Sequence, residues 1–152
     1  MRLILALPAI AVAFASTPTQ AVECSGMGIR HHADAQEVKK IEEGPTTYLV
    51  RSTGMNVRLK PDVATAWQEC SGLWTAQQNG SGSGFGSCYA IDDAGDSWGV
   101  TWEVKDGERT WETVFGTGKH AKNIGDKGTF VSNVETFSDG FRMNQWSGEC
   151  AD

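Results

Sequence analysis

The sequence predicts an all-β domain: an antiparallel closed β-barrel of about eight strands in meander order, with an N-terminal arm. Beyond residue 45 no window keeps a helical period, and short alternating segments recur between Gly, Asp, Asn and Ser. The 18 glycines among 152 residues suit a chain with many turns. A closed barrel is favoured over an open sheet because closure leaves no exposed strand edge.

The N-terminal segment is predicted to be a signal peptide. Arg2 precedes an apolar run over residues 3–15 that is too short to span a bilayer in the usual way. Cleavage fits after Ala15 or after Ala21, and we take residues 1–21 as the cleaved signal and residues 22–152 as one barrel domain. Since no second apolar run is long enough to span a membrane, the product is expected to be secreted or periplasmic.

The first part of the domain gives the weakest structural signals. Residues 34–43 are compatible with a short helix or an edge strand. Residues 46–51 and 55–60 indicate two strands on either side of residues 52–54, which end in a glycine. The following hairpin is clearer: residues 66–76 and 85–92 are its predicted strands, and a stretch rich in Gly, Ser, Gln and Asn joins them.

The strongest local pattern spans residues 97–116. Apolar residues alternate with small or polar ones along its first half, at Trp98, Val100, Trp102 and Val104. Asp106-Gly107 is typical of the two-residue turn of a β-hairpin. That turn sets Trp102 opposite Trp111 and Trp98 opposite Phe115 on one face, and a lysine opposite a glutamate on the other. Two independent patterns therefore favour the same register.

A last hairpin is predicted around Gly140. Residues 137–141 fit either a two-residue turn or a three-residue loop with a bulge at Gly140. The second alternative pairs Phe137 with Phe141, and the sequence does not choose between them.

The four cysteines are predicted to form two disulfides, because an even number in an exported domain indicates disulfides and their spacing does not suit zinc. Cys70 and Cys88 are equidistant from Asn79, so a symmetric hairpin places them opposite one another, within disulfide reach. Cys24 and Cys150 then pair and join the arm to the last strand. The rival pairings are Cys24–Cys70 with Cys88–Cys150, and Cys24–Cys88 with Cys70–Cys150.

Two segments carry a family resemblance. Residues 84–96, GFGSCYAIDDAGD, resemble a G-x-G-x-C segment followed by D-x-D/A-G-D in small exported bacterial proteins. Residues 116–120, GTGKH, followed by two glycines and Phe130, resemble the GGTGKF loop of allene-oxide-cyclase-like and dirigent-like barrels. Phe115 and His120 depart from that loop, where Gly and Phe or Tyr are usual. The resemblance implies an eight-stranded barrel with an apolar cavity, often a homotrimer, and implies no particular activity.

The aromatic face of the strongest hairpin is the main candidate for a ligand-binding site. It consists of Trp98, Trp102, Trp111 and Phe115, and the register adds Arg109 near one end. These side chains suit a packed barrel core, with indole N–H groups bonded to nearby oxygens. They equally suit the wall of a cavity for a flat or apolar ligand, where Arg109 could stack on an indole or bind an anionic group.

Other motifs favour structural roles. Residues 116–128 lack the spacings of nucleotide-binding loops and are expected to cross one barrel end, with ligand contact through Lys119 or His120 as the alternative. The acids of residues 92–96 lack the pattern of a calcium loop and are expected to cap backbone N–H groups in a turn. The adjacent His31-His32 pair points in two directions, so we predict neither a metal nor a cofactor.

Composition narrows the function without fixing it. The net charge of −6 and the isoelectric point of about 5.0 argue against a nucleic-acid partner. We expect an exported barrel that binds a small apolar or aromatic molecule in a Trp-lined cavity, or that serves as a stable envelope protein. The alternatives are a cyclase or isomerase that uses the cavity as a template, since positioning alone can catalyse ring closure, and a protein-interaction or inhibitor module. No nucleophile motif decides whether the protein is an enzyme.

Overall fold

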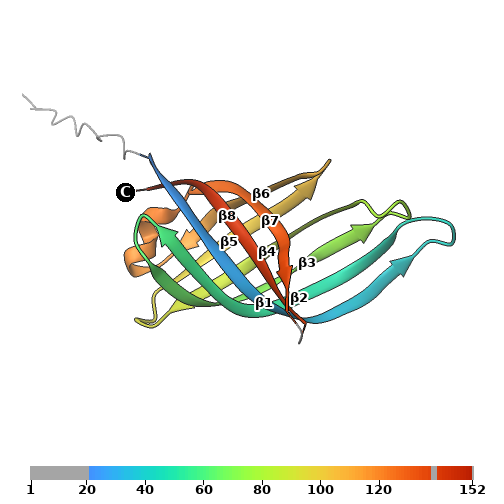
Figure 1. Ribbon diagram of the computed structural model, residues 1–152, viewed down its shortest axis with the longest axis horizontal. Coiled ribbons are helices and arrows are strands. Elements are labelled where there is room, and N and C mark those ends of the chain that lie inside the picture. The colour runs from blue at the N-terminus through green and yellow to red at the C-terminus, as the bar shows by residue number, and fades with distance from the viewer. Residues whose placement is uncertain (1–20, 138–139, 152) are drawn as a thin grey trace, which may run out of the picture.

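A computed structural model describes residues 21–137 and 140–151, apart from the side chains of residues 32–34 and 133. Eight antiparallel strands close into a barrel in sequence order, and β1 completes the ring by pairing with β8 (Figure 1). The predicted all-β closed barrel is confirmed. The predicted signal peptide, apart from Ala21, lies outside the described residues.

The strands are β1 (Ala21–Lys40), β2 (Thr46–Lys60), β3 (Ala64–Ala76), β4 (Gly82–Asp92), β5 (Ser97–Lys105), β6 (Glu108–Gly116), β7 (Lys127–Thr136) and β8 (Phe141–Ala151). A short 3₁₀ helix, η1 (Gly118–Asn123), connects β6 to β7 at the barrel end where β8 finishes (Figure 1). Within the described residues no helix is long and apolar enough to cross a membrane.

Residues 34–40 follow the edge-strand alternative: they belong to β1 and pair there with β2 alone. The segment before them, expected as an arm, is the first half of the same strand and is paired on both sides. One expectation for this part of the domain is wrong. The two short strands expected around residues 52–54 are one strand, β2, because Gly54 pairs with Arg30 within the ladder instead of turning. A side chain at Gly54 would meet the carbonyl oxygen of Ile29, so glycine here permits the close approach of β1 and β2.

The hairpin of β5 and β6 has the predicted turn and most of the predicted register. Lys105 pairs with Glu108 and Trp102 pairs with Trp111. The pairing of Trp98 with Phe115 is wrong, because a bulge beside Val100 shifts the register and leaves Gly116 opposite Trp98. Phe115 therefore points outward, and 44% of its surface is exposed.

Both predicted disulfides are confirmed. Cys70 lies directly opposite Cys88 on β3 and β4, and Cys24 of β1 is bonded to Cys150 of β8. In the last hairpin the N–H of Phe137 donates to the carbonyl oxygen of Phe141 at 2.8 Å, and Gly140 has a φ of 78°. These features favour the alternative with a bulge at Gly140, although the two residues before it lie outside the described part.

Tryptophans and glycines are packed against one another inside the barrel. The inward-facing tryptophans are Trp74, Trp98, Trp102, Trp111 and Trp146. An added Cβ at Gly72 or Gly86 would collide with the ring of Trp102, and one at Gly148 would collide with the ring of Trp111. Glycines on the facing strands thus make room for the indoles, which explains why a chain of this size combines many glycines with six tryptophans.

The fully packed part of the interior is small. Its buried apolar residues are Cys24, Ala66, Cys70, Cys88, Ala90, Val104 and Cys150. None of these is a large aliphatic or aromatic residue, although such residues usually dominate a protein core. The sixth tryptophan, Trp67, lies on the outer surface and is 47% exposed.

Candidate functional site

The candidate site is the lumen of the barrel. Trp98, Trp102 and Trp111 face inward as predicted, yet each of them is only partly buried. Side chains at the centre of a close-packed barrel would lose nearly all contact with solvent. Their remaining exposure shows that solvent reaches part of each indole. Two surface depressions of about 350 Å³ each lie elsewhere, on the β1–β2 and β5–β6 hairpins, and contain no tryptophan.

Arg30 is an inward-facing residue that the sequence analysis missed. Its guanidinium lies over Gly28, where an added Cβ would come within 3.1 Å of Nε. Arg30 Nη2 donates a hydrogen bond of 2.8 Å to Gln68 Oε1, while the buried Nε has no hydrogen-bond partner. Burial lowers the pKa of Arg30 to about 10, because desolvation penalises the charged form.

Most of the buried or inward-facing charges on the strands are arginines. Four of them are partly buried at inward-facing positions: Arg30, Arg58, Arg109 and Arg142. Every glutamate of the chain is exposed, and the buried carboxylates among the described residues belong to Asp92 and Asp126.

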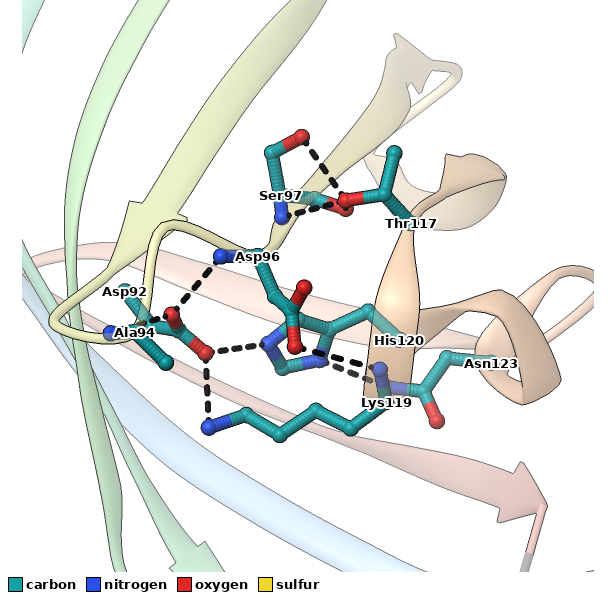
Figure 2. Close-up of polar contacts among 8 residues, drawn as sticks. All are labelled: Asp92, Ala94, Asp96, Ser97, Thr117, Lys119, His120 and Asn123. Atoms are coloured by element: carbon teal, nitrogen blue, oxygen red, sulfur yellow. Dashed lines mark hydrogen bonds and ion pairs between the residues drawn. The ribbon is translucent and has the colours of Figure 1, made fainter.

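A cluster of polar side chains, called the plug here, lies beside η1 at one end of the barrel (Figure 1). It consists of Asp92, Asp96, Lys119, His120 and Asn123 (Figure 2). Asp92 Oδ1 accepts hydrogen bonds from the N–H groups of Ala94 at 2.9 Å and Asp96 at 3.0 Å. Asp92 Oδ2 lies 2.7 Å from Lys119 Nζ and 3.0 Å from His120 Nε2. The predicted capping of backbone N–H groups by this turn is thereby confirmed for Asp92.

The plug fastens η1 to the β4–β5 turn. The N–H of Lys119 donates to Asp96 Oδ2 at 3.2 Å, and the ring of His120 packs on Trp98 with centroids 4.3 Å apart. The Lys119 ammonium, assisted by His120 and the two N–H groups, holds the pKa of Asp92 well below its usual range. The same ion pair raises the pKa of Lys119.

His120 has no free ring nitrogen. Nε2 faces the Asp92 carboxylate, and Nδ1 lies 3.4 Å from Asn123 Nδ2, which donates to it. A neutral imidazole that donates through Nε2 and accepts through Nδ1 uses its whole hydrogen-bonding capacity. The arrangement is therefore structural, and it fits the predicted crossing of one barrel end by residues 116–128.

The structure brings together most of the predicted ligand-binding residues. Arg109 faces inward opposite Val104, on the same face as Trp102 and Trp111. Phe115 is excluded by the bulge, so its place in the predicted wall is wrong. His31 contacts the ring of Phe141, with centroids 5.1 Å apart, whereas the side chain of His32 lies outside the described residues.

No protein-family model, curated protein or solved structure matches the chain. The two disulfides are compatible with an oxidising extracellular environment. The functional conclusion therefore rests on the residues of the lumen and the plug.

Proposed function

We propose that this protein is an exported barrel that binds a small aromatic or apolar molecule in its lumen. The observation that carries the proposal is the inward-facing set of Trp98, Trp102 and Trp111, which stays partly exposed in a barrel whose buried apolar residues are small. Indole rings offer large, flat faces for stacking and apolar contact. An eight-stranded barrel is wide enough to hold one small ligand.

The two ends of the barrel differ, and this difference indicates the end through which a ligand enters. The plug joins η1 to the β4–β5 turn at one end of the barrel (Figure 2). The opposite end is bordered by hairpins, of which the β1–β2 hairpin extends furthest (Figure 1). A ligand enters from the hairpin end and rests against the indoles above the plug.

A second candidate function is a cyclase or isomerase that shapes a substrate in the same lumen. Arg30 favours it, because its unpartnered N–H group could stabilise negative charge that develops on an oxygen of the substrate. His120 does not contribute proton transfer here, since both of its ring nitrogens are occupied. This candidate requires conversion of the bound molecule, whereas the first requires binding only.

The proposal is tested with the indole N–H signals of ¹⁵N-labelled, oxidised protein during titration with 2-naphthamide, a flat uncharged probe. We expect the signals of Trp98, Trp102 and Trp111 to shift together and that of the outward-facing Trp67 to stay unchanged. Trp67→Phe serves as the matched control and should bind the probe as the unmodified protein does. Shifts confined to Trp67, or no shifts at millimolar probe, would exclude the lumen as the binding site.

A further inference from the structure

We infer that the lumen ligand is a small aromatic acid whose carboxylate is bound by Arg30 with Arg142 beside it. This inference rests on the proposed function and adds the chemical class of the ligand. It depends on the hydrogen bonds of Arg30, on the register of β1 and β8, and on the position of the carboxylates of this chain.

Arg30 is incompletely paired for a buried cation. Among the described residues it has one side-chain hydrogen-bond partner, the neutral amide of Gln68, and its Nε–H has none. A buried guanidinium is costly unless it is both charge-paired and hydrogen-bonded. Its flanking inward positions, Gly28 and Gly54, carry no side chain that could pair with it, and its own guanidinium lies over Gly28.

Arg142 increases the positive charge at the same place. It is the cross-strand partner of Arg30 on β8, and both residues face inward. Like charges directly opposite on neighbouring strands destabilise a sheet. Among the described residues neither arginine has a carboxylate within ion-pair distance. Two guanidinium forks side by side can hold a carboxylate through paired N–H···O bonds.

No carboxylate of the described residues is placed to act as the counter-ion of Arg30. Asp92 is the carboxylate nearest along the inward rows, two positions beyond Ala90, which stands in the same row as Arg30. Its oxygens already accept from Lys119, His120 and two backbone N–H groups. The buried Asp126 lies on the segment between η1 and β7 and accepts a hydrogen bond from the N–H of Ala151 at 2.7 Å. The glutamates are all exposed. The counter-ion of Arg30 is therefore a group of the ligand.

The wall opposite the arginines accounts for the aromatic part of the ligand. β5 is four strands from β1 in either direction around the eight-stranded ring, and it contributes Trp98 and Trp102. Gly54, Gln68 and Ala90 lie between Arg30 and Trp98 in the same inward row. Gly54 and Ala90 project little into the lumen, and Gln68 is turned toward Arg30 by its hydrogen bond. A flat acid can thus place its carboxylate on the β1–β8 side and its ring on the β5 side.

The test compares two probes of one shape by isothermal titration calorimetry: 2-naphthoate, which is an anion, and 2-naphthamide, which is neutral. We expect the naphthoate to bind about 10- to 100-fold more tightly, as charge-assisted hydrogen bonds inside a protein provide. Arg30→Gln should remove this preference by weakening the binding of 2-naphthoate more than that of 2-naphthamide. Arg142→Gln should reduce the preference in part.

Arg51→Gln is the matched control, because it removes one positive charge from an exposed position. It should leave both affinities unchanged, which separates a local site from a general effect of charge. Equal binding of the two probes, or an unchanged preference in both Arg30→Gln and Arg142→Gln, would overturn the anion site and leave the proposed function standing. Failure of both probes to bind the unmodified protein would overturn the proposed function as well.

Discussion

The plug and the lumen hold a buried charge in opposite ways. In the plug, the Asp92 carboxylate accepts two backbone N–H groups and faces both Lys119 and His120. In the lumen, the Arg30 guanidinium has a single neutral partner and an unsatisfied N–H group. A buried charge with all its hydrogen-bond and ion-pair partners holds the surrounding structure in one arrangement. A buried charge that lacks partners is expected to lower stability unless a ligand supplies them. We therefore assign a structural role to the plug and a ligand-binding role to the lumen.

The disulfide at the plug end should show the largest effect on stability. Cys24–Cys150 joins residues 126 positions apart, whereas Cys70–Cys88 joins residues only 18 apart. Chain entropy predicts a loss of about 5 kcal/mol for Cys24→Ser with Cys150→Ser, and about 3 kcal/mol for the other pair. Urea unfolding of the two double variants measures the difference. A larger loss for the Cys70 and Cys88 pair would show that loop closure is not the dominant contribution.

The lumen wall is tested next by Trp102→Ala. Trp102 fills the space above Gly72 and Gly86, and truncation leaves a cavity that the rigid strands cannot close. We expect a loss of about 3–5 kcal/mol in the free energy of unfolding, measured with denaturant. The control, Trp67→Ala on the outer surface, should cost about 1 kcal/mol or less. Equal losses for the two variants would contradict the inward packing of Trp102.

The plug is tested by Asp92→Asn and its dependence on pH. The pKa of Asp92 in the folded protein lies below its unfolded value of about 4, so its carboxylate contributes stability that is present above about pH 4. That contribution is lost as the pH falls from there toward the depressed pKa. The variant should melt several degrees lower than the unmodified protein at pH 7, and the gap should narrow below pH 4. The control Asp93→Asn, at an exposed position of the same turn, should show no such gap.

The smallest effect, and one of opposite sign, is expected for Arg30→Met. Replacing a poorly paired buried charge by an apolar side chain should stabilise the empty barrel by about 1 kcal/mol. Thermal unfolding without ligand measures the change, and the exposed position Arg51→Met provides the control. A loss of stability comparable to that of Asp92→Asn would mean that Arg30 is a structural residue, and the contrast between lumen and plug would disappear.

The sequence predicted those parts of the fold that short-range chemistry determines. Asp106-Gly107 fixes its turn, and the position of Asn79 midway between Cys70 and Cys88 fixes theirs, so both registers follow from local residues. The bulge beside Val100 has no such local signal. It turns Phe115 outward, although the regular alternation of the hairpin predicts that Phe115 faces inward.

The lumen was harder to predict because β1 reverses the usual alternation. Its apolar residues Met27 and Ile29 face outward, while Gly26, Gly28 and Arg30 face inward. A pattern based on burying apolar side chains assigns these faces the wrong way round. Gly26 makes room for the ring of Trp146 from β8, and Gly28 makes room for the guanidinium of Arg30. The sequence alone does not show such contacts. The alternation of glycines along a strand was the available signal.

The central claim is that the lumen holds a small molecule, and native mass spectrometry of protein purified from its own host tests it most directly. The account predicts a species heavier than the disulfide-bonded chain by the mass of one small aromatic acid. That excess should disappear on denaturation and should be reduced in protein that carries Arg30→Gln. A spectrum that contains only the mass of the chain, from protein that also fails to bind 2-naphthamide, would contradict the account.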